Sequence, residues 1–593
     1  MNTQTTSLEN IRHSLAHLLA TAALEHDPHA TLGVGPVIDN GFYYDIQFSQ
    51  PFSENMLPKL EKRMRGLMRR SLPFTRQDIS PKDARAQFAN QPFKLELIDE
   101  IETKGEAITL YKTGDVFVDL CRGGHVENTK EIPADAFALT HIAGAYWKGD
   151  EKNPMLTRIY GLAFETKQEL EAYRAHIEEA KKRDHRKVGK ELGLFVFSDL
   201  IGSGLPIYTP KGAIVRREII RFSNELQSAI DYQEVHTPNI NKADLFKVSG
   251  HYEKYREDMF RVVSNYSEEE YFLKPMNCPQ HTQIYASTLR SYKDLPLRFA
   301  DFSNLYRDEK PGELSGLTRL RCFCQDDGHS FCREDQIKEE FSSVLNAIKK
   351  AMEVYGMTYT IRLSLWDPMH PENYLGDASV WEKSQTLLET ILIENNIEYY
   401  KTEGEAAIYG PKMDLISHDS LGRKWQISTI QLDFIMPQRF KLVYTDSDGK
   451  EKTPVMIHRA LVGSPERFLG ILIEHYAGNF PTWLSPLQVD ILPVSEKHHD
   501  YAKRLAQTLR DHGIRTQIND NNETLGKKVR QAKTSKTPYF LVLGEQEIES
   551  QTIAVESRDE GKLGAMTLPD FIEKLREEIR SRSHTLTQKQ KTD

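Results

Sequence analysis

Three of the five cysteines lie in the stretch CFCQDDGHSFC at residues 322–332, beside a histidine and two aspartates. Cysteine, histidine and carboxylate side chains are zinc ligands, and two close thiols are also the elements of a redox pair. A zinc knuckle typically has about two to four residues between its thiols, whereas one residue separates Cys322 from Cys324. The surrounding alternation predicts a strand with both thiols on one face. We expect them to fill space, which leaves Asp327 and His329 for chemistry.

Two further pairs of metal-ligand residues occur near the amino terminus. His13 and His17 in RHSLAHLLA are four residues apart, which places them on one face of a helix. Cys121 and His125 have the same spacing in DLCRGGH. Together these side chains have the ligand inventory of zinc, although each pair alone is more often a buried structural feature. The residues alone leave both interpretations open.

The composition is that of a soluble globular protein, with 39% hydrophobic and 27% charged residues. A chain of 593 residues is too long for one core, so we expect about three to four domains. The net charge of −9 argues against a nonspecific nucleic-acid or DNA-binding protein, so any RNA contact must use local basic clusters such as residues 181–187. Without a signal sequence or a spanning apolar run, the chain is expected to be cytoplasmic, with no membrane contact and with reduced thiols.

The elements that must position these residues change along the chain. Residues 1–185 mix β-like and helical runs and end in a connecting helix from Lys167, because that segment is rich in helix formers and lacks proline. Residues 186–484 alternate helices with Val/Ile/Tyr/Phe-rich runs, which predicts a large, mostly antiparallel sheet. Residues 485–593 alternate strand and helix, which predicts an α/β domain with a parallel-rich sheet. An α+β multidomain fold is therefore expected.

Five motifs occur in the order KPMNCPQH, RCFCQDDGH, IYGPK, WQISTIQLDF and VMIHRALVGSPERF. The segment around NLYRDE and RCFCQDDGH resembles the second signature motif of class II aminoacyl-tRNA synthetases, and the set resembles the threonyl-tRNA synthetase family over nearly the whole chain. The resemblance implies an editing domain with its connecting helix at 1–185, a class II catalytic domain at 186–484 and an anticodon-binding domain at 485–593. It also implies a form without the ubiquitin-like domain that commonly precedes the editing domain.

The resemblance groups three residues that no spacing rule joins. Cys278 in MNCPQH, His329 in QDDGH and His458 in VMIHR match the ligands of the single zinc ion (Zn²⁺) in the family's catalytic pocket. Three protein ligands leave a coordination position open for substrate. Zinc that takes the amino and hydroxyl groups of threonine would reject valine, which an apolar pocket alone disfavours by only about 10²-fold.

The same motifs imply the contacts to L-threonine and ATP. Asp327 resembles the carboxylate that accepts a hydrogen bond from the substrate hydroxyl. Arg307 and Arg467 match the arginines of the second and third signature motifs, whose planar forks grip phosphate oxygens in pairs. Arg319 is expected as a second phosphate contact, Glu309 at the adenine, and magnesium (Mg²⁺) with the ATP phosphates. The remaining threonine-binding residues are expected to be Met276, Tyr409, Gln426 and Gln431, with Gln426 also beside ATP.

The two amino-terminal pairs resemble the editing domain of the family, a pocket that works there without metal. Serine carries the same amino and hydroxyl groups as threonine, and its missing methyl group is worth only about 1–3 kcal/mol of discrimination. A second, hydrolytic pocket for Ser-tRNA(Thr) would correct that error. The general base is left open among the matching residues, which are His13, His17, Lys94, Asp119, Cys121 and His125.

The resemblance implies a threonine-tRNA ligase that forms threonyl adenylate from L-threonine and ATP, transfers the threonyl group to tRNA(Thr) and edits Ser-tRNA(Thr). The segment YQEVHTPNI around Pro238 resembles the class II dimer interface and implies a homodimer. Two alternatives are weighed against this function. One is a paralogue that edits or resists an inhibitor rather than sustaining bulk translation, favoured by changed residues such as Gln280 where the family commonly has glycine. The other is a catalytically silent tRNA- or RNA-binding regulator. Arg307, Arg467 and the complete metal triad favour the enzyme.

Overall fold

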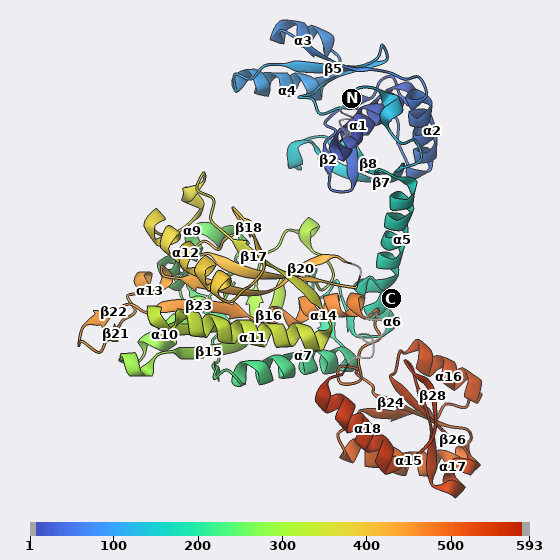
Figure 1. Ribbon diagram of the computed structural model, residues 1–593, viewed down its shortest axis with the longest axis vertical. Coiled ribbons are helices and arrows are strands. Elements are labelled where there is room, and N and C mark those ends of the chain that lie inside the picture. The colour runs from blue at the N-terminus through green and yellow to red at the C-terminus, as the bar shows by residue number, and fades with distance from the viewer. Residues whose placement is uncertain (1–6, 421, 584–593) are drawn as a thin grey trace. The chain divides into compact units, whose positions relative to one another are not determined.

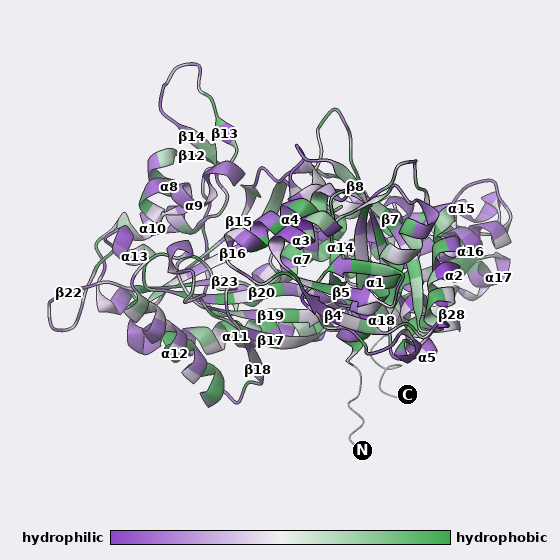
Figure 2. Ribbon diagram, turned by 90° about the horizontal axis from the view of Figure 1, so that it is seen from above, coloured by the Kyte–Doolittle hydropathy of each residue, from purple (hydrophilic) through white to green (hydrophobic). Residues whose placement is uncertain are grey.

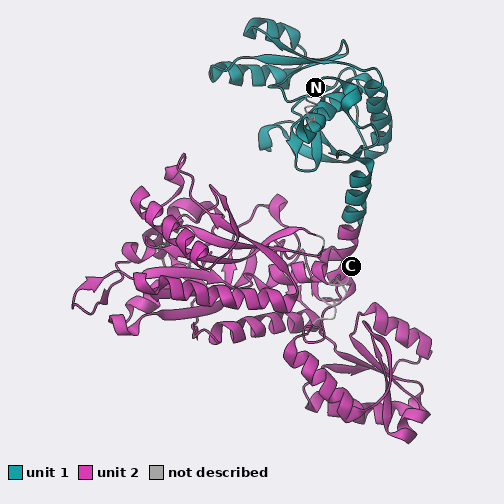
Figure 3. Cartoon of the chain, in the orientation of Figure 1, with its two compact units in different colours: residues 1–178 teal, residues 179–593 magenta. Residues whose placement is uncertain are grey.

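The structure is a computed structural model that describes residues 7–420 and 422–583. It divides into two compact units, residues 1–178 and 179–593, which Figure 3 colours separately. The division falls inside helix α5 (Lys167–Arg183). Among the helices of the described residues, none combines the length and the apolar composition that crossing a bilayer requires.

The first unit contains an antiparallel sheet with strand order β1-β3-β8-β7, with β2 paired to β3, and a second sheet, β4-β5-β6. Helix α1 (Leu8–His26) begins where the Ser7 hydroxyl accepts a hydrogen bond from the backbone of Asn10, and it packs against α2 (Leu57–Met68) and β3. Its apolar residues, among them Leu15, are buried in the core of the unit. The other elements are β1 (Thr31–Leu32), β2 (Val37–Ile38), β3 (Gly41–Gln47), β4 (Phe74–Asp78), α3 (Pro81–Gln87), α4 (Pro92–Thr103), β5 (Thr109–Thr113), β6 (Phe117–Leu120), β7 (Phe137–Tyr146) and β8 (Met155–Ala163).

The second unit is built around an eight-stranded sheet. Its inner pairs are antiparallel, and only the edge pairs β11–β15 and β17–β18 are parallel, which confirms the predicted mostly antiparallel sheet. In sheet order the strands are β11 (Gln233–Glu234), β15 (Leu297–Tyr306), β16 (Cys322–Cys332), β23 (Val455–Ala460), β20 (Lys424–Asp433), β19 (Lys412–His418), β17 (Thr358–Ser364) and β18 (Tyr399–Thr402).

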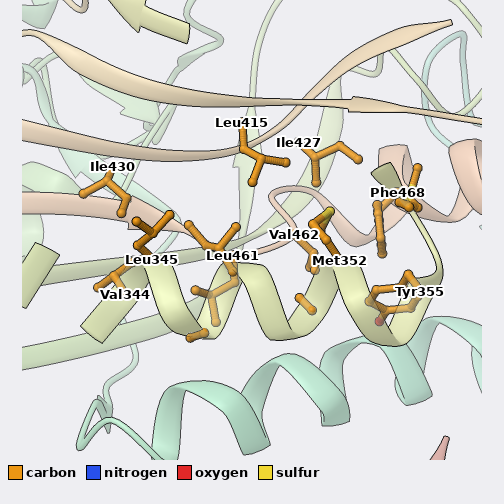
Figure 4. Packing of buried hydrophobic residues seen from close by; sticks show 14 of the residues in the cluster. Val344, Leu345, Met352, Tyr355, Leu415, Ile427, Ile430, Leu461, Val462 and Phe468 are labelled. Atoms are coloured by element: carbon orange, nitrogen blue, oxygen red, sulfur yellow. The ribbon is translucent and has the colours of Figure 1, made fainter. Parts of the chain in front are cut away.

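Helices cover this sheet and supply its core. Helix α11 (Ile337–Tyr355) packs against β17, β20 and β23, and α7 (Pro210–Ser228) packs against α11, as Figure 1 shows. Helix α12 (Ala378–Glu394) carries apolar and polar residues along its length (Figure 2), as expected of a helix with one buried face. Figure 4 shows the apolar face of α11 meeting the strands and α14 (Pro465–His475) through Val344, Leu345, Met352, Tyr355, Leu415, Ile427, Ile430, Leu461, Val462 and Phe468.

The carboxy-terminal part of the second unit has a five-stranded sheet of order β25-β24-β26-β27-β28. The pairs that β24 forms with β25 and β26 are parallel, whereas β26, β27 and β28 form an antiparallel meander, so the α/β domain predicted here has a mixed sheet. Its elements are β24 (Val489–Pro493), α15 (His499–Asp511), β25 (Thr516–Ile518), α16 (Leu525–Thr534), β26 (Tyr539–Leu543), α17 (Glu545–Ser550), β27 (Thr552–Ser557), β28 (Gly561–Thr567) and α18 (Leu568–Ser581).

The connecting helix differs from the single helix predicted from Lys167. It ends at Arg183, and a separate helix, α6 (His185–Glu191), follows. Asp184 leaves the helical conformation, with φ −46° and ψ 121°, and its side chain accepts a hydrogen bond from the backbone N–H of Arg186 at 2.8 Å. An aspartate that bonds the backbone in this way favours a helix start over a helix interior.

Candidate functional site

Three side chains from separate elements converge at the eight-stranded sheet. Cys278 begins α10 (Cys278–Ala286), His329 lies on β16 and His458 on β23. One ligand atom of each lies within 4.8 Å of the others, and all three residues are buried. The two histidines meet because the antiparallel register pairs their positions directly. The structure thus brings together the residues expected to bind zinc.

Hydrogen bonds assign the free nitrogen of each histidine. Nε2 of His458 lies 3.0 Å from Oδ2 of Asp433 and therefore carries the proton, while its buried Nδ1 has no hydrogen-bond partner among the described residues. Nδ1 of His329 lies 2.7 Å from Nδ1 of His281, and its buried Nε2 is likewise without a partner there. Burial raises the pKa of the neighbouring Cys278 thiol. Orphaned nitrogens beside a buried thiol are unfavourable without a cation, so this donor set fits a zinc ion.

The hydrogen bonds continue beyond His329. With Nε2 of His329 free, its Nδ1 carries the proton and donates to Nδ1 of His281. The proton of His281 is then on Nε2, which lies 3.9 Å from Oδ2 of Asp301. Burial would raise the pKa of Asp301, but the nearby His281 ring and a hydrogen bond from the Thr237 hydroxyl lower it overall. Such outer partners fix the orientation of metal-binding imidazoles.

Four residues expected to bind threonine surround this triad. The ring of Tyr409 stacks on that of His458 with centroids 4.6 Å apart, and its hydroxyl donates to Oε1 of Gln431 at 2.9 Å. A carboxylate oxygen of Asp327 lies 3.7 Å from Nε2 of His329. Met276 packs in the same apolar cluster as Cys278 and Tyr409. These four side chains therefore lie around the three candidate ligands.

A cleft of ≈ 530 Å³ has Gln431 in its wall, and Gln431 lies opposite His458 in the sheet. Arg307 and Arg467 both line it, and the Arg307 guanidinium lies 5.2 Å from the centre of the Phe323 ring. Within residues 7–420 and 422–583, no carboxylate forms an ion pair with either arginine. Burial lowers the pKa of Arg467, and the charge of Arg307 lowers it further. Two adjacent cations without counter-charges make the cleft a binding site for anions.

The other predicted ATP contacts also line the cleft, but each already has a partner. Nε of Arg319 donates to Oε2 of Glu309 at 2.8 Å, and the same guanidinium pairs with Glu313 at 3.1 Å. The amide of Gln426 donates to Oδ1 of Asp414 at 2.8 Å. A phosphate that contacts Arg319 must therefore compete with two carboxylates.

The predicted editing residues come together in the first unit. Ligand atoms of His13, His17, Cys121 and His125 all lie within 4.8 Å of one another. His13, His17 and Cys121 line a pocket of ≈ 370 Å³, while His125 stacks on His13 with ring centroids 4.2 Å apart. Burial lowers the pKa of His125 to about 2 and raises that of Cys121 to about 11. Burial also lowers the pKa of His13 and His17, so at neutral pH the imidazoles are uncharged and the thiol is not ionised.

The same pocket has a buried charged pair in its wall. Nζ of Lys94 lies 2.5 Å from a carboxylate oxygen of Asp119. The hydroxyl of Tyr44 donates to the same carboxylate and accepts a hydrogen bond from Lys94 at 3.1 Å. Sequence reasoning missed Tyr44, because a tyrosine in a strand is more often a packing residue.

Comparison with known proteins identifies the family. The family model "tRNA synthetase class II core domain (G, H, P, S and T)" matches residues 260–476, "Anticodon binding domain" matches 488–578, and "Threonyl and Alanyl tRNA synthetase second additional domain" matches 108–160. A curated threonine–tRNA ligase of Thermotoga petrophila is 47% identical over 577 residues, which cover 97% of this chain and 88% of the relative. The chain belongs to the threonyl-tRNA synthetase family.

Other members and solved structures agree with this family. A threonine–tRNA ligase of Thermus thermophilus is 47% identical over 586 residues, covering 96% of this chain and 88% of that protein. The structure described as the RNA binding domain of threonyl-tRNA synthetase from Cryptosporidium parvum aligns with a TM-score of 0.64 and 37% identity, covering 66% of this chain and 98% of that one. The expected fold class, a class II core with editing and anticodon-binding domains, is confirmed.

Gln280, which stands where the family commonly has glycine, does not point at the metal ligands. The Gln280 amide donates to the carbonyl of Pro238 at 2.8 Å, so it contacts the segment that resembles the class II dimer interface. Cys324 is buried and Cys322 half-buried, and all five cysteines are free, which agrees with thiols that fill space.

Proposed function

We propose that this chain is a threonine–tRNA ligase with a second, hydrolytic activity towards Ser-tRNA(Thr). The observation that carries the proposal is the convergence of Cys278, His329 and His458 beside a cleft with two uncompensated arginines. Family membership and the class II core support it. The carboxylate of L-threonine attacks the α-phosphorus of ATP and pyrophosphate leaves. A ribose hydroxyl at the end of tRNA(Thr) then attacks the threonyl carbonyl and AMP leaves.

Zinc would be held by Sγ of Cys278, Nε2 of His329 and Nδ1 of His458, the atoms left free by the surrounding hydrogen bonds. Bound there, it supplies a Lewis-acid site for the amino and hydroxyl groups of threonine. Asp327 would accept a hydrogen bond from the substrate hydroxyl. Valine cannot make that bond, and Tyr409 helps to exclude water from the pocket.

The cleft would hold ATP as its magnesium complex. Arg307 would contact the α-phosphate and Arg467 the phosphates that leave, because the two arginines line the same cleft without counter-charges from the described residues. Arg319 would exchange its carboxylate partners for phosphate oxygens, which frees Glu309 to bind the adenine end. Fixed cations of this kind stabilise charge that develops during phosphoryl chemistry.

The outer hydrogen bonds of the triad give a prediction for zinc binding. Substitution His281→Ala removes the acceptor that orients His329, so zinc affinity should fall about 10- to 100-fold. Competition with a chromophoric chelator measures this affinity directly. The control is His418→Ala on β19, outside the site. This substitution should leave the zinc affinity unchanged. Equal zinc affinity for wild type and His281→Ala would remove His281 from the metal site.

The first unit would hydrolyse Ser-tRNA(Thr), with the editing residues binding and activating water. His17→Ala removes a buried, neutral imidazole from this pocket, so the hydrolysis rate should fall about 10²-fold. The control is His26→Ala at the exposed end of α1. The rate of Ser-tRNA(Thr) hydrolysis and the rate of threonine activation are measured on the same preparation of each variant. Loss of both activities in His17→Ala would indicate misfolding rather than an editing defect.

Several assignments complete the proposal. The editing domain with its connecting helix would occupy residues 1–185, the catalytic domain 186–484 and the anticodon-binding domain 485–593. The matched anticodon-binding and class II models support the last two. The exposed segment around Pro238 would form a homodimer interface, and the protein would act in the cytoplasm.

The decisive experiment is ATP–pyrophosphate exchange with threonine, valine or serine as the amino acid. A ligase should exchange with threonine, respond weakly to serine and ignore valine. A catalytically silent RNA-binding regulator would exchange with none of them. The same assay tests for an inhibitor-resistant paralogue. Such a protein would keep its exchange activity at inhibitor concentrations that stop exchange by other family members.

A further inference from the structure

His185 lies within the basic cluster at residues 181–187, but its ring is buried and connects two parts of the second unit. Its Nε2 accepts the backbone N–H of Leu317 at 2.9 Å. Because an amide can only donate, Nε2 has no proton, and Nδ1 therefore donates to Oε1 of Glu474 at 2.7 Å. The backbone N–H of His185 donates to the same oxygen at 3.0 Å. The ring is thus fixed in one tautomer with both nitrogens engaged.

The carboxylate that holds this ring is itself anchored. Glu474 lies near the end of α14, the helix that carries Arg467, and it forms an ion pair with Arg423. Burial would raise the pKa of Glu474, but hydrogen bonds from His185 and the charge of Arg423 lower it overall. Glu474 and His185 also lie close enough to Asp184 to share a metal ion. The ring nitrogens are already used, however, so the group is a hydrogen-bond relay.

The other end of the relay is the loop at residues 307–321 between β15 and β16. Leu317 is fully buried, and it lines the ATP cleft with Thr318 and Arg319. Gly316 has φ +49°, and a Cβ there would lie 2.1 Å from Nε2 of His185. The loop is therefore built directly against the imidazole.

We propose that His185 is a positioning residue that holds this loop, with Glu309 and Arg319, in the conformation that binds ATP. The inference rests on the proposed function of the cleft. The proposal also gives α6 a role in ATP binding. His185, the first residue of this helix, connects the loop at residues 307–321 to α14. Without the imidazole, the buried N–H of Leu317 has no acceptor and the loop loses its fixed point.

Two isosteric substitutions separate the two ends of the relay. In His185→Gln the amide oxygen can reach the position of Nε2 and accept from Leu317, whereas in His185→Asn the shorter side chain can reach only Glu474. We expect His185→Asn and His185→Ala to raise the KM for ATP in threonine-dependent exchange about tenfold, and His185→Gln to stay within about twofold of wild type. The KM for threonine and the hydrolysis of Ser-tRNA(Thr) should not change.

The readouts distinguish positioning from a general structural role. Lower melting temperatures for all three variants with an unchanged KM for ATP would overturn the proposal, as would an unchanged KM in His185→Asn. A wild-type protein without exchange activity would instead refute the proposed function. In that case, binding of an ATP analogue to the same variants still tests the role of His185.

A substitution on the loop side tests the same contact. Gly316→Ala should raise the KM for ATP because its methyl group displaces the imidazole, whereas Gly312→Ala in the same loop meets no atom within 4 Å and serves as the control. Adding His185→Ala to Gly316→Ala should raise the KM by less than about twofold further, since both break one contact. If the two substitutions instead raised the KM for ATP independently, so that their effects multiplied in the double variant, the proposed contact would be contradicted.

Discussion

Substitution Cys278→Ala is expected to remove the bound zinc and to lower threonine-dependent ATP–pyrophosphate exchange about 10⁴-fold, the effect of losing the polar recognition of a substrate hydroxyl. The thiol is one of three converging ligands, and it is buried beside the two histidines. Two protein ligands from histidine alone hold zinc weakly. The variant therefore loses the group that binds the amino and hydroxyl ends of threonine.

The measurement combines metal analysis with exchange kinetics. Wild type should carry one zinc per chain and discriminate threonine from valine, while Cys278→Ala should carry none and lose most of that discrimination. Cys332→Ala is the matched control, because Cys332 is also buried but packs in the main core rather than in the cluster that contains Cys278. Full exchange activity in a zinc-free Cys278→Ala protein would refute the role of the triad.

The sequence predicts some parts of this site better than others. Cys278, His329 and His458 lie far apart in the chain, and only the resemblance to the family grouped them. Their convergence depends on the pairing of β16 with β23, which sets the two histidines opposite each other. Local patterns predicted that a large antiparallel sheet exists, but hydrophobic alternation does not determine which strands pair or in which register.

Most of the outer contacts could not be predicted from the sequence. Asp301, Asp433 and His185 act through tertiary hydrogen bonds, which leave no periodic signal in the sequence. His281 offered only a weak one, a histidine three residues after Cys278. The break in the connecting helix at Asp184 had a local signal, since aspartate favours helix starts, but the many helix formers around it outweighed that signal.

Substitution Arg467→Ala is expected to lower the maximal exchange rate about 10³-fold, a typical loss when one electrostatic contact to the transition state is removed. Arg467 follows the start of α14, where the Ser464 hydroxyl caps the helix and fixes the direction of the first turn. Its half-buried guanidinium lies in the cleft wall, which Arg307 also lines, without a carboxylate partner among the described residues. The charge on the departing pyrophosphate would therefore be its main counter-charge.

The shape of the side chain should matter as well as its charge. Arg467→Lys keeps the charge but loses the planar fork that binds two phosphate oxygens, so it should recover only a small part of the rate. Arg221→Ala on the exposed side of α7 is the control for a general loss of positive charge. Hydrolysis of Ser-tRNA(Thr) should be unaffected in all three proteins, because the editing residues lie in the other unit. An Arg467→Lys variant with the full exchange rate would show that Arg467 acts only as a point charge. An Arg467→Ala variant with an exchange rate within about tenfold of wild type would show that Arg467 does not stabilise the transition state.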